Sequence, residues 1–438
     1  MKVNSLAALI VLGSVLMLSG CGGSSSSDST SAETYLQFYN GAPGSGSTSF
    51  KAGDIAIGTA VYADVTALVT IKPDQYQLKL TDVVSADEVL SEELTLTEGD
   101  KSLFILTEQQ QQFDMLRVNF KRDTQLDKQF KLHLVNLSAQ QPQFDVYLSS
   151  ESKGFADAEM LDSLTLHEIS SVSQAKDVGK FNLYLTASGA STPMFVANDI
   201  SFAYASDYVL IVRDKHGPIA NQLSVDVVLN SSAVSAYVDT GAPAQFRLYN
   251  SLPQQVAVSL DNTELSQVTA GQLSDYLPLN KGDYSLSVRD NSNQLLLNSA
   301  LMSVTAGDSK AVLLYANQQQ QVEALSIAEP EAPQLQAHDV MVANLAADFD
   351  KLHFYFVRDN ETIATARYSV KNLPFKKQQS INLPKDYYAI SLVHVAENGS
   401  TTLLDKTATL QLEPGKRYML LAEQDDAAPS GYKLTLVH

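Results

Sequence analysis

The sequence predicts an all-β fold, arranged as a tandem array of four antiparallel, two-layer sandwiches. Three observations predict it: short stretches in which apolar and polar residues alternate, a pattern of about ten residues written four times, and glycine-bearing turns between the stretches. Alternation with a period of two is typical of strands that have one buried and one solvated face. The four copies of the pattern are KPDQYQLKLTD, DVGKFNLYLTA, KGDYSLSVRD and PKDYYAISLVH.

The chain opens with a segment typical of an export signal. Lys2 supplies a positive charge ahead of an apolar run, Leu6 to Leu18, which is too short to span a bilayer comfortably. Residues 18–21 read LSGC and resemble the lipobox of bacterial lipoproteins. We therefore predict a signal peptide over residues 1–20, cleavage between Gly20 and Cys21, and lipid attachment at Cys21.

The lipobox resemblance implies a membrane anchor. Cys21 is the sole cysteine; its thiol would take a diacylglycerol and its freed amine a further acyl chain, and more than one chain gives firm anchoring. Gly22 in place of an aspartate implies the outer membrane, with the body facing the periplasm or the cell surface. A free thiol or an intermolecular disulfide is the alternative reading of a lone cysteine. Glycine and serine make residues 21–33 a flexible tether that carries the acylated cysteine.

Composition limits the class of protein and the kinds of partner that the remaining residues, about 400, can have. With 45% hydrophobic and 18% charged residues, the chain is globular in type. Its formal net charge is −19, and no basic cluster interrupts the acidity. These features exclude nucleic acid as a partner and favour solubility as the main effect of the charge.

The repeat boundaries follow from the recurring order of strands. Each repeat begins with a strand ending in asparagine, then has the ten-residue pattern, a glycine-bearing turn with a strand pair, and a closing strand. A repeat of about 100 residues with about seven strands suits an immunoglobulin-like sandwich; a single long solenoid, the alternative, has shorter units. We predict repeat 1 over 34–120, repeat 2 over 129–229, repeat 3 over 241–328 and repeat 4 over 338–438.

Three seams separate the repeats, at residues 121–128, 230–240 and 329–337. The last seam, EPEAPQLQA, bears prolines and is predicted to be extended and stiff. The ten-residue pattern itself is explained by core formation, with an aromatic residue as a plug whose hydroxyl can bond to nearby backbone, as in a tyrosine corner. The plug residues are Tyr76, Phe181, Tyr284 and either Tyr387 or Tyr388.

Repeat 3 resembles a known family. Between Phe246 and Ala316 the chain reads RLYNSLPQQVAVSLDNTELSQVTAGQLSDYLPLNKGDYSLSVRD and then LMSVTAGDSKAVLLYA. This is similar to the bacterial extracellular domain of unknown function DUF4397. The resemblance implies a cell-envelope β-sandwich without catalytic residues. The other repeats depart from the pattern. Repeat 2 lacks Gly-Asp at the late turn, and repeat 4 has the sequence INLPKDYY at the corner where the ten-residue pattern begins.

Candidate chemistry is sparse. The seven histidines show no metal-ligand spacing, and no nucleophile elbow, phosphate loop or calcium loop is present in the sequence. A pair formed by His353 and His394, on strands expected to be neighbours, is the one candidate arrangement, with polar strand residues as the simpler reading. Residues 290–293 and 425–426 offer weak calcium loops that turn chemistry explains better. The histidines are His133, His167, His216, His338, His353, His394 and His438.

Two runs of four glutamines occupy the same place in repeats 1 and 3, after the late core strand. A hairpin tip of this kind offers many hydrogen-bond donors and acceptors to an envelope protein or a glycan, whereas the alternative is a solvated tip retained after duplication of a pair of repeats. The candidate binding residues are Gln109, Gln110, Gln111, Gln112, Gln318, Gln319, Gln320 and Gln321.

Together these features predict a non-catalytic, membrane-tethered protein of the cell envelope, used for binding, adhesion or scaffolding. We expect no catalytic residue, no metal and no cofactor other than the covalent lipid at Cys21. An envelope enzyme, or its accessory subunit, that uses a cleft between repeats is the main alternative. A carrier of a small molecule or an ion, with an enclosed cavity, is a third.

Overall fold

The computed structural model describes residues 33–123 and 125–438, and it is all-β, as predicted. Within those residues the helical part is one 3-10 turn, Phe155–Asp157, and no helix there is long and apolar enough to cross a membrane. The predicted signal peptide, its cleavage site at Gly20, the anchor Cys21 and the tether fall outside the described residues, apart from residue 33.

Each repeat contributes two sheets. We call the sheet that contains the first strand the inner sheet and its companion the outer sheet. In repeat 1 the inner sheet has the order β4 (Val69–Ile71), β1 (Thr34–Asn40), β7 (Asp100–Gln109), β8 (Gln112–Lys121), and the outer sheet β3 (Ile55–Ala60), β2 (Thr48–Ala52), β5 (Gln75–Asp82), β6 (Glu88–Thr95). In repeat 3 the inner sheet has the order β22 (Leu277–Leu279), β19 (Ala244–Asn250), β25 (Ser309–Ala316), β26 (Val322–Ala328), and the outer sheet β21 (Thr263–Val268), β20 (Val256–Leu260), β23 (Gly282–Asp290), β24 (Leu295–Val304).

The even-numbered repeats follow the same plan with additional short strands. In repeat 2 the inner sheet has the order β12 (Ile169–Ser171), β9 (Gln129–Asn136), β16 (Asp207–Lys215), β17 (Gln222–Val228), β18 (Ser235–Val238), with β13 (Lys176–Asp177) also on β9; the outer sheet has β11 (Glu159–Thr165), β10 (Gln143–Ser150), β14 (Gly179–Ala187), β15 (Pro193–Phe202). In repeat 4 the inner sheet has β30 (Gln378–Pro384), β27 (Ala337–Asn344), β34 (Met419–Gln424), β35 (Tyr432–Val437); the outer sheet has β29 (Tyr368–Pro374), β28 (Lys351–Val357), β31 (Tyr387–Val395), β32 (Thr401–Lys406), with β33 (Leu410–Gln411) also on β31.

The inner sheets are mixed, which corrects the prediction of purely antiparallel sheets. In each repeat the first strand runs parallel to the late core strand: β1 with β7, β9 with β16, β19 with β25, and β27 with β34. A parallel neighbour requires a long crossover, because the chain must return to the starting edge of the sheet. Here the crossover is the outer sheet itself, so the first strand and the late strand lie side by side although most of the repeat separates them in sequence.

The ten-residue pattern forms the strands predicted for it, β5, β14, β23 and β31, each with a neighbour on both sides in its outer sheet. Alternation holds in β23, where Leu286 and Val288 are buried and Arg289 is exposed. The turn glycines Gly99 and Gly307 have positive φ, 73° and 76°, a backbone conformation that glycine adopts without steric cost.

Every repeat has a hydrophobic cluster between its own two sheets. In repeat 1 this cluster is centred on three phenylalanines, Phe38, Phe50 and Phe104, whose ring centroids lie 5.3 and 5.4 Å apart in succession. Apolar burial of this kind, about 25 cal/mol per Å², is the main stabilising contribution to such a sandwich.

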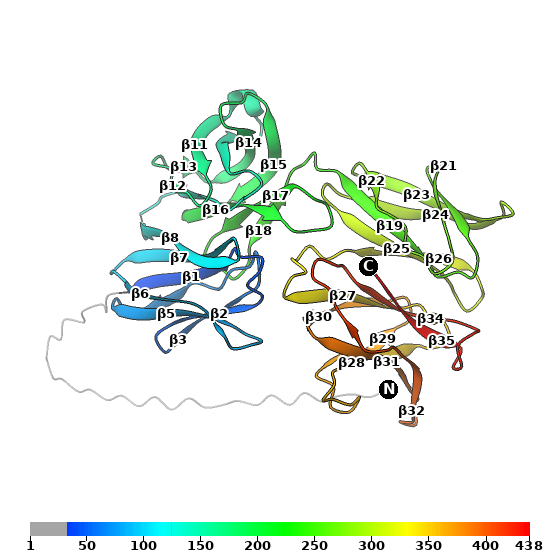
Figure 1. Ribbon diagram of the computed structural model, residues 1–438. Coiled ribbons are helices and arrows are strands. Elements are labelled where there is room, and N and C mark those ends of the chain that lie inside the picture. The colour runs from blue at the N-terminus through cyan, green and yellow to red at the C-terminus, as the bar shows by residue number, and fades with distance from the viewer. Residues whose placement is uncertain (1–32, 124) are drawn as a thin grey trace, which may run out of the picture.

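Two further clusters join the repeats in pairs. One lies between the inner sheets of repeats 1 and 2 and includes Ile105 and Ile211; the other lies between those of repeats 3 and 4 and includes Leu313 and Leu421. The central inner strands are therefore buried on both faces; in β7, for example, the first eight residues are all buried. Figure 1 shows the result: repeats 1 and 2 make one half of the molecule, and repeats 3 and 4 make the other.

A buried tyrosine marks each pair interface. Tyr39 of repeat 1 donates its hydroxyl to Asp226 Oδ2 of repeat 2 at 2.7 Å, and Tyr249 of repeat 3 donates to Glu423 Oε1 of repeat 4 at 2.8 Å. Arg213 Nε donates to the same Asp226 Oδ2 at 2.7 Å. Burial raises the pKa of both tyrosines, and the neighbouring carboxylates raise it further, so each hydroxyl stays protonated and able to donate.

The seams between repeats contain more regular structure and more buried residues than flexible linkers between independent domains would have. Residues 230–240 include β18, which pairs with β17 and so extends the inner sheet of repeat 2. The third seam, predicted to be extended and stiff, has no strand before β27 begins at Ala337, and its residues Glu329 and Gln334 are buried. Arg247 of repeat 3 binds Glu329 at 2.7 Å, so this seam is packed into the body.

Candidate functional site

A cleft lies between repeats 1 and 4, the first and last parts of the described chain. It has a volume of about 640 Å³, within the range of about 300–1,000 Å³ typical of ligand sites, which often occur between domains. Figure 1 places the two repeats beside each other, each at the edge of its half that faces the other half. The wall from repeat 1 is formed by residues 43–47, 61–62, 82, 84–85, 87–89 and Phe113, and the opposite wall by residues 332–333, 336–337, 382 and 384–385.

The repeated asparagine builds one wall of this cleft. All four first strands end in a fully buried asparagine whose Oδ1 accepts the N–H two residues later, which turns the chain toward the outer sheet. In repeat 1, Asn40 Oδ1 also accepts from Ser45 Oγ at 3.0 Å, and its Nδ2 donates to Gly46 O at 3.1 Å. The amide of Gly44 donates to Glu108 Oε2 at 2.7 Å. The loop 43–47 is thereby held in place from both sides.

The β5–β6 turn forms the next part of the same wall. Asp82 Oδ1 accepts the main-chain N–H of Val84 at 2.9 Å and of Ser85 at 2.7 Å. These bonds hold the turn in a shape that leaves Val84 56% exposed at the cleft. Gly46 approaches this turn closely: a Cβ at that position would lie 3.1 Å from Asp82 Oδ2 and 3.9 Å from Gln336 Cβ on the other wall.

The tyrosine corner builds the opposite wall. Tyr388 of repeat 4 donates its hydroxyl to Pro384 O at 2.8 Å, and Pro384 lines the cleft. Tyr76 and Tyr284 make the same bond to the carbonyl four residues upstream, at 3.0 and 2.8 Å. The predicted corner is thus present in repeats 1, 3 and 4. Tyr388, and not the exposed Tyr387, is the plug in repeat 4.

The two walls differ in charge. Repeat 1 places three carboxylates at the cleft, Asp82, Asp87 and Glu88, whereas the other wall carries Lys385. Glu88 also pairs with Lys79 at 3.0 Å. Among the described residues, no hydrogen bond or ion pair engages the carboxylate of Asp87 or the ammonium group of Lys385.

A polar junction beside the cleft holds the two halves together. Lys215 of repeat 2, which is almost fully buried, pairs with Glu331 at 2.7 Å and donates to Gly307 O of repeat 3 at 3.3 Å. Arg417 of repeat 4 donates to the carbonyl of His216, and that imidazole packs edge-on against Tyr62 at a centroid distance of 5.1 Å. Burial lowers the pKa of His216 and raises that of Tyr62, so both side chains are neutral near pH 7.

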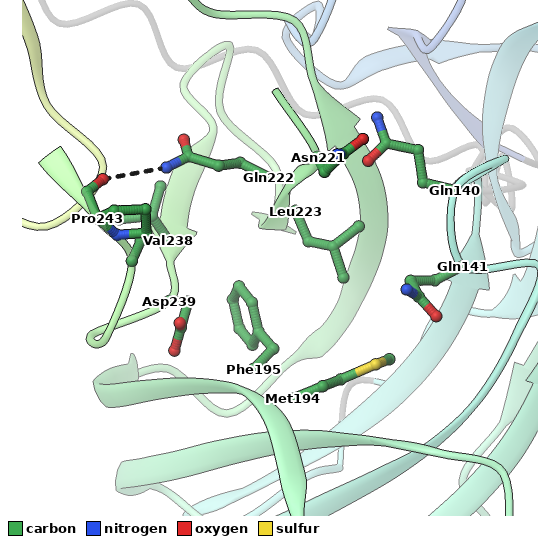
Figure 2. Close-up of a pocket in the computed structure, with 11 residues that line it drawn as sticks. Gln140, Gln141, Met194, Phe195, Asn221, Gln222, Leu223, Val238, Asp239 and Pro243 are labelled. Atoms are coloured by element: carbon green, nitrogen blue, oxygen red, sulfur yellow. Dashed lines mark hydrogen bonds between the residues drawn. The ribbon is translucent and has the colours of Figure 1, made fainter. Parts of the chain in front are cut away.

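A smaller cavity of about 240 Å³ lies between repeat 2 and the first residues of repeat 3 (Figure 2). Met194, Phe195 and Leu223 form its apolar surface, and residues 238–243 close one side. Gln222 Nε2 donates to Pro243 O at 3.4 Å across it. This volume is below the usual range for a ligand site, and the cleft is therefore the better candidate.

The predicted glutamines lie at exposed hairpin tips, as expected for their place after the late core strand. Gln109–Gln112 close the β7–β8 hairpin, and Gln318–Gln321 close the β25–β26 hairpin. The tips belong to different halves of the molecule, and neither lines the cleft, although Phe113, which follows the first tip, does. Gln318 Nε2 donates to Ala347 O of repeat 4 at 2.7 Å, so one of these side chains has a structural partner.

The other sequence candidates have structural roles. His353 and His394 lie on paired strands, as predicted, but His353 is opposite Val393 and the ring of His394 packs on Phe349 at 4.6 Å. Asp290 Oδ1 and Asp425 Oδ1 each accept main-chain N–H groups of their own turns. Over residues 33–123 and 125–438, no three His, Cys, Asp or Glu side chains lie close enough together to hold a metal ion.

Fold and cleft together define an all-β repeat protein in which a cleft separates two of the repeats. Residues 244–355 match the family model described as Domain of unknown function (DUF4397), which confirms the resemblance seen in repeat 3. The match extends from β19 through the third seam into β28.

No curated protein matches the chain. Among solved structures, the Bacillus anthracis TIE protein is similar over 90% of this chain and 68% of its own, at 9% identity and a TM-score of 0.15. At that TM-score the likeness supports no inference about fold or function.

Proposed function

We propose that the protein is a non-catalytic lipoprotein of the bacterial outer membrane, a tethered body that binds a partner of the cell envelope. The observation that supports this function best is the cleft between repeats 1 and 4. Its walls are already held in shape by Asn40, Asp82 and Tyr388, so little ordering entropy is lost when a partner binds. Adhesion and scaffolding use the same property, because both need a rigid binding surface at the end of a tether.

The proposed localisation in the outer membrane rests on the N-terminal sequence. The short apolar run, the LSGC stretch and the serine-rich residues that follow are arranged as in an exported, acylated protein. The proposed body is four immunoglobulin-like sandwiches. The two sheets of each repeat, the cluster between them and the tyrosine corner in three repeats support this assignment.

The anchor is tested by replacing the cysteine. Cys21→Ser removes the thiol that would be alkylated, so we expect an unacylated precursor that takes up no labelled palmitate. A matched change in the tether, Ser24→Ala, leaves the thiol in place and should label like the native chain. Membrane fractionation combined with lipid labelling makes the measurement. Incorporation of label into the Cys21→Ser protein would disprove the anchor, and protease shaving of intact cells distinguishes a periplasmic from a surface orientation.

A second candidate function is an envelope enzyme or accessory subunit that uses the cleft. Polar side chains from two repeats, among them Asp87 and Lys385, line the same cleft, which is the arrangement such an enzyme needs. A hydrolase activity of the purified chain that disappears with Asp87→Asn would favour this candidate and rule out a non-catalytic role.

A further inference from the structure

The chemistry of the cleft walls specifies a class of ligand, and this inference rests on the proposed binding function. We propose that the cleft between repeats 1 and 4 binds an extended peptide segment of an envelope partner, in which basic and apolar side chains alternate. Three features of the cleft favour this ligand: its apolar lining, the placement of its charged groups, and the strand edges that border it.

The apolar lining favours peptide side chains. Val61 and Val84 are 52% and 56% exposed, and they lie in the same concave surface as Phe113, Pro333 and Pro384. Large aliphatic groups exposed singly are ordinary, but their grouping in a cleft indicates a surface that becomes covered. Covering them with apolar side chains contributes about 25 cal/mol per Å² of area removed from water.

Tyr62, one of the two aromatic residues that line the cleft, is engaged by neighbouring residues of the protein. Tyr62 donates its hydroxyl to Asp214 O at 2.7 Å and packs against Arg213 and His216. Tryptophan, the side chain with the largest stacking surface, is missing from the sequence. The lining is therefore better suited to aliphatic side chains than to a saccharide.

Charge complementarity selects a basic segment. Asp87 and Glu88 project at the start of β6, and within the described residues the carboxylate of Asp87 has no partner, whereas Glu88 has Lys79 at 3.0 Å. A lysine or arginine of the ligand would pair with Asp87 at the rim of the cleft. Lys385 on the opposite wall would pair with an acidic group or the carboxyl terminus of the ligand. Pairs of this kind orient the ligand and increase its association rate more than they increase its affinity.

Strand edges border the cleft on both sides. β6 ends the outer sheet of repeat 1 and begins at Glu88, and β30 ends the inner sheet of repeat 4 and finishes at Pro384. In the described part of the chain, no strand pairs with the free edge of either one. An extended peptide can use such main-chain groups, and alternation of its side chains then directs basic groups to one side and apolar groups to the other.

The test measures binding of defined probes to the soluble chain, residues 22–438. The first probe is a fluorescein-labelled ten-residue peptide of alternating valine and lysine; its valine–glutamate counterpart and maltohexaose are the second and third. Fluorescence anisotropy measures the two peptides, and calorimetry measures the sugar. We expect saturable binding of the valine–lysine peptide and at least tenfold weaker binding of the other two. Equal binding of the valine–glutamate peptide, or tighter binding of maltohexaose, would overturn the ligand class.

Matched variants locate the binding. Asp87→Asn with Glu88→Gln removes two charges at the cleft, and Asp54→Asn with Glu92→Gln removes two from exposed positions of the same repeat outside it. The Asp87→Asn, Glu88→Gln variant should bind the valine–lysine peptide at least tenfold more weakly than the native chain. The Asp54→Asn, Glu92→Gln variant should lose less than twofold in affinity. Equal losses would mean nonspecific attraction to an acidic chain and would end the proposal.

The apolar wall is tested by Val84→Ser. Because Val84 is exposed, the exchange should leave the thermal unfolding temperature unchanged, and it should weaken peptide binding at least threefold. An unchanged affinity would contradict the apolar contact. Failure of the ligand class is distinguishable from failure of the anchor: a Cys21→Ser chain should keep peptide binding and lose its membrane association. The full chain with Asp87→Asn and Glu88→Gln should keep its membrane association and lose peptide binding.

Discussion

Single residues decide how neighbouring repeats pack. Tyr39 and Tyr249 stand directly before the buried asparagine in the odd-numbered repeats, and Val135 and Ala343 occupy that place in the even-numbered ones. Tyr39 and Val135 both belong to the hydrophobic cluster between repeats 1 and 2, and Tyr249 and Ala343 both belong to the cluster between repeats 3 and 4. Each tyrosine hydroxyl is one of several donors to a buried carboxylate of the partner repeat, and the loss of a donor to a buried charged group is costly.

Tyr39→Phe and Tyr249→Phe should each destabilise the protein by about 1–2 kcal/mol, because each removes a donor from a buried carboxylate and leaves the ring in place. Urea denaturation, followed by circular dichroism, measures the free energy of unfolding. Tyr387→Phe is the control, since Tyr387 is 52% exposed; its effect should stay within about 0.5 kcal/mol. Equal effects at all three positions would show that the interface hydroxyls do not contribute to stability.

At the scale of strands, inner and outer sheets have different burial. β25 is buried along nearly its whole length, because one face contacts the outer sheet of repeat 3 and the other contacts repeat 4. β24, at the edge of the outer sheet, alternates between exposed and buried positions near its end. Strands covered on both faces read as continuous apolar runs, and AVLLYA in β25 has that character. The continuous apolar run of β25 therefore indicates burial on both faces, whereas alternation indicates a strand with one solvated face.

Two leucines of repeat 3, Leu313 in the inner sheet and Leu301 in the outer sheet, allow the contributions of the two sheets to be compared by mutation. Leu313→Ala should cost about 2–5 kcal/mol, because the side chain is fully buried between repeats 3 and 4 and its loss leaves a cavity. Leu301→Ala, at a position 75% exposed, should cost less than about 0.5 kcal/mol. Chemical denaturation of both variants makes the comparison. A small loss at Leu313 would mean that the cluster between repeats contributes little.

At the scale of the whole molecule, the four repeats form two halves instead of a row. The hydrophobic clusters between repeats join 1 to 2 and 3 to 4, while contacts between the halves are largely polar, such as Lys215 with Glu331. Apolar interfaces of this type are typical of permanent association, and polar ones permit adjustment between bodies. Because the cleft lies between the halves, its width depends on the polar junction.

A fragment of residues 241–438, containing repeats 3 and 4, should fold as a soluble monomer, because its shared cluster stays covered. A fragment of residues 241–328, repeat 3 alone, exposes Tyr249, Leu313 and their neighbours to water, and such a patch promotes association. Light scattering after size exclusion and binding of a hydrophobic dye measure the difference. A soluble, monomeric repeat 3 that binds no dye would contradict the paired architecture.

Much of the local structure was predictable because it depends on neighbours in sequence. The strands of the ten-residue pattern, the tyrosine corner of Tyr284 and the exposed glutamine tips follow from alternation and turn chemistry within a few residues. The cleft was not predictable, because Asp87 and Lys385 are brought together by contacts between halves, and neither residue has a distinctive local pattern. The parallel pairing of β1 with β7 was missed for the same reason.

By itself, the sequence determined the all-β class, the repeated unit and the positions of most core strands, and its N-terminal residues predict an exported lipoprotein. These properties depend on which side chains alternate and which residues permit turns, and both are local. The tertiary structure alone decided which repeats share a hydrophobic interface, which carbonyls and carboxylates meet across it, and that repeat 1 faces repeat 4. Those outcomes depend on the shapes of complete sheet faces, because protein interiors are close-packed and two faces join only where their side chains interdigitate.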